Sequence, residues 1–567
     1  MSAAAGAVNT PRVGGYRGVM VALHRPELLL ELDLTTAPVE TEPEDVLAKL
    51  RSRNRPRLRA MLRALHEAGG DASVRGLLVK VGGGALPWAT MQELRAGLQA
   101  FAASGRPVVV WAESFGEGGN GTADYVLASA GTQVWLQPSG ELGLLGVAAE
   151  ATFLRGALDK LGVEPQLDQR YEYKSAADRI MRAEFTPAHR EALDRVVESL
   201  WDGAVADIAA GRSLTAETVR ALAEQAPLTA DEAREAGLVD RVGYRDEVYA
   251  ALREQVGDDA RLLFADQWHP RRRPVELLRR HRDVVALVEA HGAIAAGRSR
   301  NSPQGPVLGS TTVSGALRAA REDERVRAVL FRVDSPGGSA VASDTIWREV
   351  ALIREAGKPV IVSMGSVAGS GGYYIACPAD VIVASAATIT GSIGVFGGKV
   401  VIGDLLDRLG LGTGAVAHGG RSRMYSLRQG FTDDERGRLG ELLDRVYADF
   451  VQKVADGRRL TYDAVHEVAR GRIWTGADAA GNGLVDTLGG LRDAAAIARE
   501  RGGLAADAPV RVAVHVPPLE RLRRPRSSDD PRAAAAAVSA WGDLGGLAAR
   551  LGLPAGGPLA MPTIRIR

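Results

Sequence analysis

The sequence predicts an α/β protein made of two tandem copies of one domain. Short segments rich in β-branched residues alternate with longer segments of helical periodicity, and a series of sequence matches recurs in the same order about 250 residues apart. Alternating strands and helices are typical of crossover units, which build a largely parallel or mixed sheet. The 567 residues, 46% hydrophobic and 25% charged, fit a folded protein of two to four domains.

The repeat is defined by pairs of similar segments that are separated by a nearly constant number of residues. VRGLLV at 74–79 resembles VRAVLF at 326–331, an offset of 252 residues (326 minus 74), and GRPVVV at 105–110 resembles GKPVIV at 357–362 at the same offset. Later pairs, such as FT at 185–186 and 431–432, keep the order with offsets of 246 to 251. Small drifts of this kind are expected from loop insertions and deletions between two copies.

The second copy shows the expected elements most clearly. Buried strands are predicted at 284–288, 328–333, 360–364 and 381–384, because these runs are short, continuous and β-branched. Helices are predicted at 343–356 and 433–457, where apolar residues recur at helical spacing.

The repeat divides the chain into five parts. We expect an N-terminal extension at 1–17, a first copy at 18–265, a basic linker at 266–283, a second copy at 284–509 and a low-complexity tail at 510–567. The basic runs RRR at 271–273 and RRHR at 279–282 favour a solvated linker over a contact with phosphate or lipid headgroups. In the tail, apolar residues between 538 and 551 could line a short amphipathic helix that docks on this protein, a partner or a membrane surface.

Composition excludes several functional classes. Seventy basic against 69 acidic residues leave a net charge of +1, so no global field favours nucleic acid. The single cysteine, Cys377, permits neither an internal disulfide nor a multi-thiolate metal site. No metal or organic cofactor is expected, because the glycine runs lack a phosphate-binding lysine pattern.

We see no targeting signal in the sequence. No apolar run approaches the roughly 18 to 20 residues of a membrane-spanning helix, and residues 1–15 lack the pattern of a secretory signal. We therefore expect a cytoplasmic chain, either soluble or peripherally associated with a membrane.

Glycine-rich turns after strands are the strongest local signal for chemistry. They occur at 333–339 (VDSPGGS), 364–374 (MGSVAGSGGYY) and 390–397 (TGSIGVFG). Glycines at a helix start let backbone N–H groups face a developing anion. Ser370, flanked by glycines at 369, 371 and 372, can be held on a tight bend with its hydroxyl exposed. A plain structural turn is the alternative for each segment.

A nucleophilic serine needs a base, and His291 and His418 of the second copy are each isolated in the sequence. Lysine can act if burial lowers its pKa, whereas arginine cannot be deprotonated. Only seven of the 70 basic residues are lysines. Lys174 of the first copy maps onto 420–425 of the second, which holds no lysine, and Ser370 maps onto Gly121. The two copies therefore predict a composite site where they meet.

These motifs resemble the long, duplicated form of signal peptide peptidase A, a serine protease of the Clp-protease/crotonase-like fold. The resemblance covers about residues 70–500 and rests on DSPGG at 334–338, GSGGY at 369–373, TGSIG at 390–394 and YKSA at 173–176. It implies that Ser370 is the nucleophile, Lys174 the general base and Ser392 a hydrogen-bond partner of the lysine amine. It also implies an oxyanion hole formed by the N–H groups of Gly338 and Gly371.

The resemblance further implies peptide substrates, above all remnant signal peptides or other extended hydrophobic peptides. It implies a homo-oligomeric ring, possibly a tetramer, that encloses the active sites. Because no spanning segment is seen, membrane peptides would require peripheral membrane contact, and soluble peptides are also candidate substrates. Two alternatives stay open: a crotonase-like acyl-CoA hydratase or hydrolase, and a non-catalytic scaffold that binds peptides or membranes. Lys399, near the Ser392 turn, is a weaker candidate base.

Overall fold

The computed structural model describes residues 27–40, 55–83, 86–257, 259–269, 283–302 and 305–513, and the backbone at 559–560 and 565–566. The expected N-terminal extension at 1–17, the basic run at 271–282 and the amphipathic helix at 538–551 lie outside these residues. Within them, no helix is both long enough and apolar enough to cross a lipid bilayer.

The first copy is built on a six-stranded parallel sheet of order β10-β1-β2-β3-β4-β9. Its strands are β1 (Leu28–Asp33), β2 (Val74–Lys80), β3 (Val108–Ala112), β4 (Gln133–Leu136), β9 (Arg241–Val242) and β10 (Arg261–Phe264).

The second copy repeats this order as β23-β11-β15-β17-β18-β22, again with parallel pairing. Its strands are β11 (Val284–His291), β15 (Val326–Ser335), β17 (Val360–Gly369), β18 (Val381–Ala384), β22 (Thr487–Leu488) and β23 (Val510–Val512). The four strands predicted here lie within β11, β15, β17 and β18. Two further strands extend β17 at its C-terminal end: β19 (Ile389–Gly391), parallel to it, and β21 (Ile473–Thr475), antiparallel to β19.

The strands of the second copy are apolar on both faces because helices cover both. In β15, Val329, Phe331 and Val333 face a core formed with α12 (Ser310–Glu322), α13 (Ala340–Glu355), α14 (Gly371–Ala376) and α16 (Asp433–Arg458). The alternate residues Ala328 and Leu330 face α19 (Leu491–Arg501). Continuous β-branched runs, rather than alternating ones, are the sequence pattern of such doubly covered strands.

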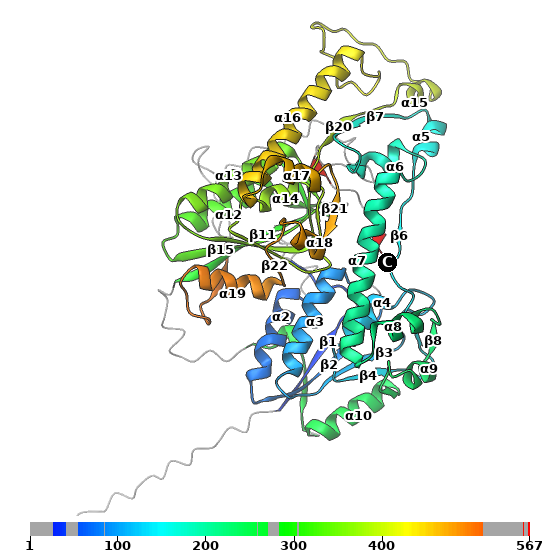
Figure 1. The fold of residues 1–567 in the computed structure, drawn as a ribbon, viewed down its shortest axis with the longest axis vertical. Helices are drawn as coiled ribbons and strands as arrows, with labels where there is room; N and C mark the ends of the chain where they lie inside the picture. Colours follow the sequence, from blue (N-terminus) through cyan, green and yellow to red (C-terminus); the bar gives the residue numbers. More distant parts are fainter. Residues whose placement is uncertain are drawn as a thin grey trace, which may run out of the picture.

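The long helices confirm the duplication (Figure 1). The helix α7 (Pro187–Arg212) and the helix α16 each span 26 residues. Each begins after a threonine whose side chain accepts a backbone N–H of the first turn, Thr186 or Thr432. Each ends at a residue with left-handed backbone. The predicted helices at 343–356 and 433–457 correspond to α13 and α16 within three residues at each end.

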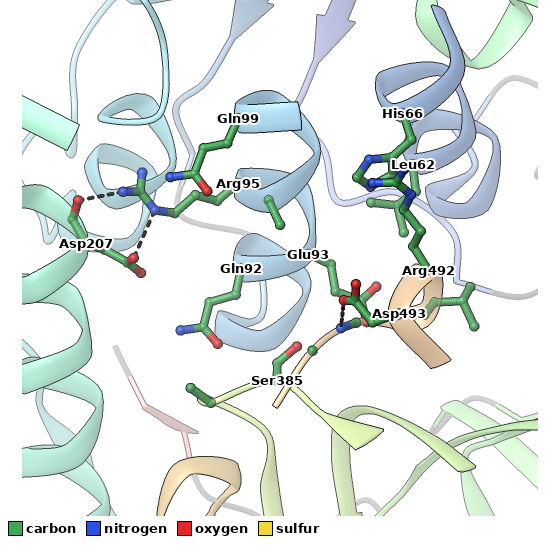
Figure 2. Close-up of a pocket in the computed structure, with 15 residues that line it drawn as sticks. Leu62, His66, Gln92, Glu93, Arg95, Gln99, Asp207, Ser385, Arg492 and Asp493 are labelled. Atoms are coloured by element: carbon green, nitrogen blue, oxygen red, sulfur yellow. Dashed lines mark hydrogen bonds and ion pairs between the residues drawn. The ribbon is translucent and has the colours of Figure 1, made fainter. Parts of the chain in front are cut away.

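The two copies meet through α3 (Trp88–Ala102) of the first, which packs on the second. Its buried Glu93 accepts a hydrogen bond of 2.7 Å from Nη1 of Arg332 on β15, which is also buried. The same guanidinium donates to Ser363 and to the carbonyl of Met364. A cavity of about 300 Å³ adjoins this junction, with Glu93 on one side and Ser385 of the second copy on the other (Figure 2).

A second connection is made by residues 164–177 of the first copy, called here the crossing segment. It contains β7 (Glu164–Gln169) and the turn Ser175–Ala177. The strand β7 pairs antiparallel with β20 (Phe396–Val401) of the second copy over six residues. Figure 1 shows β7 beside β20, far from the first-copy sheet. The first copy thus reaches into the second where the sequence predicts Lys174 and Ser370 to meet.

Candidate active site

Ser370 stands at the junction between β17 and α14, with φ 54° and ψ −116°. This left-handed backbone is strained for a residue with a Cβ, at a cost of about 1–3 kcal/mol. It is maintained by a hydrogen bond of 2.8 Å from the Ser370 N–H to the carbonyl of Gly391. A serine placed on so sharp a strand-to-helix turn projects its hydroxyl away from both elements.

The amine of Lys174 lies directly against this hydroxyl. Its Nζ is 2.8 Å from Oγ of Ser370, 2.8 Å from the carbonyl oxygen of Ser392 and 3.0 Å from Oγ of Ser392. All three residues have no solvent exposure. The structure therefore brings together the predicted nucleophile, base and auxiliary serine, from one segment of the first copy and two of the second.

Burial lowers the pKa of Lys174 well below its ordinary value, because the charged ammonium loses its hydration. Each neighbour of the amine named above is a neutral oxygen, so none compensates for the lost hydration. A neutral amine is the form that can accept a proton from a hydroxyl.

Glycines make room for the lysine. A Cβ on Gly471, which has φ +87°, would lie 2.4 Å from the backbone nitrogen of Lys174. A Cβ on Gly394 would lie 3.2 Å from Cδ of the same lysine. The backbone of the crossing segment can therefore lie in van der Waals contact with the loop that precedes β21.

Ion pairs on both sides of Lys174 hold the crossing segment against the second copy. Arg170 pairs with Asp444 of α16, and Glu172 pairs with Arg470. The guanidinium of Arg472 lies over the ring of Tyr173, 5.0 Å from its centroid. These contacts are partly exposed, so each contributes little energy alone, but together they fix the register of the segment.

The loop that carries Ser392 is equally constrained. Ser392 has φ 50°, and its N–H donates to the carbonyl of Arg472 at 2.7 Å. The Thr390 hydroxyl donates to the carbonyl of Ala368 on β17. Both oxygens of Ser392 near Nζ are thus held in place by the backbone around them.

The turn predicted to form the oxyanion hole lies beside Ser370. Gly338 has φ +154°, and a Cβ there would lie 2.2 Å from the carbonyl of Ile294. A Cβ on Gly371 would lie 3.1 Å from the Gly338 nitrogen, so the two glycines are immediate neighbours. The Ser335 hydroxyl donates to the carbonyl of Gly292 and accepts the N–H of Gly337, which fixes the turn.

The other sequence candidates lie elsewhere. Lys399 donates its Nζ to the carbonyl of Met424 at 2.7 Å and lies over the ring of Phe431. His418 is exposed. His291 pairs through Nδ1 with Asp334 at 3.2 Å, at the base of the oxyanion turn.

The first copy shares one backbone hydrogen bond with the site but neither its backbone conformation nor its chemistry: Gly121 has φ −99°, whereas Ser370 has φ 54°. The N–H of Gly121, the counterpart of Ser370, donates to the carbonyl of Gly143 at 2.8 Å, as Ser370 does to Gly391. A Cβ on Gly121 would lie 1.9 Å from the carbonyl oxygen of Phe115. No side chain fits there, so within the described residues the first copy offers no counterpart of the Ser370 hydroxyl.

Sequence reasoning did not identify Gly471 or the Asp334–His291 pair. Asp334 also accepts the N–H of Val367 at 2.9 Å and so ties the oxyanion turn to β17. A comparison of the copies contained one usable signal: at an offset of 246, Gly471 corresponds to Gln225, so this glycine is specific to the copy that holds the serine.

Within the described parts of the chain, no cluster of three or more His, Cys, Asp or Glu side chains is arranged to hold a metal ion. The chemistry available at this site comes from a serine hydroxyl, a buried amine and backbone N–H groups.

Comparison with known proteins yields a family and close relatives. The sequence pattern of Peptidase family S49 matches residues 100–258 and 353–505, one stretch in each copy. "Protease 4" of Salmonella typhi is 33% identical over 455 residues, which cover 78% of this chain and 71% of the relative. "Protease 4" of Haemophilus influenzae is 30% identical, covering 82% and 77%. "Serine protease SPPA, chloroplastic" of Arabidopsis thaliana is 31% identical, covering 76% of this chain but 64% of its own length.

Substitution of Gly471 tests whether the position of Lys174 depends on this glycine. Gly471→Ala should lower the rate at which Ser370 reacts with a fluorophosphonate by at least about tenfold, because the new Cβ displaces the Lys174 backbone. Gly410→Ala is the matched control, since Gly410 also has positive φ (+70°) but open space around it. Labelling followed by intact-mass spectrometry measures both. Equal rates in the two variants would show that the contact is unimportant.

Proposed function

The chain belongs to Peptidase family S49 and is a serine protease, and from this premise we propose that Ser370 and Lys174 form its catalytic dyad. Ser370 is the nucleophile that attacks the peptide carbonyl, and Lys174 is the general base. The observation that carries the proposal is the 2.8 Å separation between Nζ and Oγ of two fully buried side chains.

The surroundings of the amine support this direction of proton transfer. A neutral amine has two N–H groups and one lone pair. The carbonyl oxygen and the hydroxyl oxygen of Ser392 can accept the two N–H groups, at 2.8 and 3.0 Å. The lone pair is then left facing the Ser370 hydroxyl, which donates its proton to Nζ as Oγ attacks.

The tetrahedral intermediate carries a negative charge on the former carbonyl oxygen. The N–H groups of Gly338 and Gly371 are proposed to donate to that oxygen. Their preorganised turn supports this role, because donors that need not reorganise stabilise the transition state most, and one such donor is worth about 10² to 10³ in rate.

The ammonium of Lys174 then returns its proton to the leaving amine, and the acyl group stays on Oγ. Water enters, gives a proton to Lys174 and attacks the ester. As this second tetrahedral intermediate collapses, the Lys174 ammonium returns the proton to Oγ, which releases the acid product and regenerates the serine hydroxyl and the neutral amine. The alternative function, a crotonase-like acyl-CoA hydratase or hydrolase, has no comparable support, because its chemistry gives no role to the buried amine.

The proposed substrates are extended peptides, including signal peptides left after processing. The relatives named above are proteases, and a further relative of Enterococcus faecium, 38% identical over 178 residues that cover 31% of this chain and 52% of the relative, bears the name "Putative signal peptide peptidase SppA". An extended chain can bind along strand edges through its backbone, which tolerates varied side chains.

We also propose that the chain forms a homo-oligomer. Adding the repeat offset of 246 to 251 to β7 gives residues 410–420 of the second copy, which are exposed throughout. There Leu411 and Val416 expose 52% and 95% of their surface. In the first copy the matching segment, β7, pairs with β20 of the second copy. A neighbouring chain could supply the same contact, and repetition of such a head-to-tail contact closes a ring.

Replacement of either dyad residue tests the proposed mechanism. Ser370→Ala and Lys174→Ala should each lower kcat/KM for an unfolded peptide by at least about 10³, because nucleophile and base act as a unit. Lys160→Ala, at an exposed lysine of the first copy, should retain the parent rate. Lys399→Ala should also retain it if the variant folds, as judged by circular dichroism. Hydrolysis at the parent rate by the Ser370 variant would refute the proposal.

The lowered pKa of Lys174 predicts the pH dependence. The rate should rise with pH as the amine loses its proton, because only the neutral form accepts the Ser370 proton. The rise should level off well below the value of about 10.4 at which an ordinary lysine titrates. A pH profile of kcat/KM measures this, with samples returned to neutral pH to confirm reversibility. A limb that continues to rise up to pH 10 would contradict a neutral resting amine.

Oligomer formation is tested at the exposed segment. Val416→Asp should reduce the mass measured by light scattering coupled to size exclusion, because a charge at an apolar contact between chains opposes association. Tyr244→Ser, which alters an exposed aromatic residue of the first copy, is the control. A monomeric parent chain, or an unchanged mass for the Val416 variant, would count against the proposed contact.

A further inference from the structure

The strand β17 contains an irregular stretch just before it reaches Ser370. In its parallel pairing with β15, residues 365–367 of β17 lie opposite the single residue Asp334. A bulge of this kind leaves backbone groups without a partner in the ladder and redirects the strand that contains it. The position of Ser370 relative to β15 therefore depends on how this bulge is held.

The carboxylate of Asp334 takes the place of a backbone acceptor at the bulge. Its Oδ1 accepts the N–H of Val367 at 2.9 Å. Gly365 leaves room for the carboxylate, since a Cβ there would lie 2.7 Å from Cβ of Asp334 and 2.8 Å from its Cγ. The side chain of Asp334 thus fixes the backbone three residues before Ser370.

The backbone of Asp334 leads directly into the oxyanion turn. Its carbonyl accepts the N–H of Gly292 at 2.9 Å, and four residues later the chain reaches Gly338 in β16 (Gly337–Gly338). The strand β16 pairs with β12 (Ala293–Ala295), which follows Gly292 in the chain. Asp334 therefore connects the strand that ends at the nucleophile with the turn whose N–H groups are the proposed oxyanion donors.

His291 holds the second oxygen of the same carboxylate. It is the last residue of β11 and lies opposite Asp334 in the pairing of β11 with β15. Its Nδ1 is 3.2 Å from Oδ2 of Asp334. With Oδ1 bound to the Val367 N–H and Oδ2 paired with His291, the carboxylate cannot rotate without losing one of these partners.

The electrostatic surroundings keep this carboxylate ionised. Burial of Asp334 opposes ionisation, but His291 and the Val367 N–H outweigh it, so the pKa of Asp334 lies below its ordinary value. Burial of His291 favours its neutral form, but the attraction of Asp334 is larger and raises the pKa of the imidazole. A hydrogen bond to an ionised carboxylate is stronger than one to a neutral acceptor.

Arg332 fixes the other end of the bulge. It lies two residues before Asp334 on β15, and its Nη1 donates to the carbonyl of Met364 at 3.0 Å. The same guanidinium pairs with Glu40 and Glu93 of the first copy, each at 2.7 Å. Ion-paired side chains of β15 therefore hold the bulge of β17 at both of its ends.

We propose that Asp334, held by His291, is a positioning residue that sets the distance between the Ser370 hydroxyl and the oxyanion turn. This inference rests on the proposed function, because it concerns the geometry of the same site. The carboxylate is bonded to Val367 and His291, so it acts through the backbone and not on the substrate. Because a displacement of about 1 Å between reacting groups can lower a rate by about 10², loss of this connection should affect turnover far more than binding.

Substitutions of Asp334 in the full chain test the positioning role. Asp334→Ala should lower kcat for a fluorogenic peptide by about 10² and change KM by less than about threefold, because the reacting groups are displaced while the binding surface is retained. Asp334→Asn should keep kcat within about tenfold of the parent, since its amide oxygen can still accept the Val367 N–H. His291→Ala should lower kcat by less than Asp334→Ala does, because it leaves that hydrogen bond in place.

Asp380→Ala is the matched control. Asp380 accepts the N–H of Val360 at 2.8 Å at the opposite end of β17, and it pairs with Arg354 at 2.9 Å. This substitution removes the same kind of bond from the same strand, far from Ser370. It should lower the melting temperature and leave kcat at the parent value.

The outcomes separate this inference from the proposed function. A parent kcat in Asp334→Ala, with activity lost in Ser370→Ala, would overturn the positioning role and leave the dyad intact. Equal losses of kcat in Asp334→Ala and Asp380→Ala, or an Asn variant as slow as the Ala variant, would overturn it as well. If Asp334→Ala does not fold, as judged by circular dichroism, His291→Ala decides: a parent kcat overturns the inference, and a lowered kcat with unchanged KM supports it. Full activity in Ser370→Ala would refute the proposed function and, with it, an inference about the same site.

Discussion

The loss of hydration at one amine is the constraint on which the site depends. The interior around Lys174 offers its Nζ only neutral oxygen partners, so the environment itself favours the uncharged form. An environment that dry requires the crossing segment to lie in close contact with the second copy. The β7–β20 pairing, the ion pairs beside the lysine and the absence of a side chain at Gly471 all contribute to that contact. Together these contacts exclude water from Nζ of Lys174.

The sequence revealed the parts of this arrangement that are local or repeated. The strands of the second copy were predictable because β-branched runs covered on both faces are continuous, and Ser370 because glycines surround it. Lys174 could be inferred because each copy lacks what the other holds. The Glu93–Arg332 pair and the contact of Gly471 with Lys174 could not, since each joins residues far apart in sequence without a periodic pattern.

Each copy of the domain forms its own core, and a buried ion pair links the two cores. Both retain the sheet order and the 26-residue helix, so each can form its own core. The buried pair of Glu93 and Arg332 then links the core of one copy to the core of the other, and Arg332 lies on β15, the strand that leads into the turn at Gly338. Breaking one partner of a buried pair costs about 3–5 kcal/mol, so the relative position of the copies is energetically defined. A composite site needs such definition because its reacting atoms belong to separate cores.

The crowded backbone at Gly121 has a consequence for evolution and stoichiometry. Because a Cβ at Gly121 would lie 1.9 Å from the carbonyl oxygen of Phe115, a serine introduced there by a single codon change cannot be accommodated unless the turn is rebuilt. In the proposed mechanism each polypeptide contributes one reactive serine, so the burst of acyl-enzyme formed before steady state should equal the molar amount of chain.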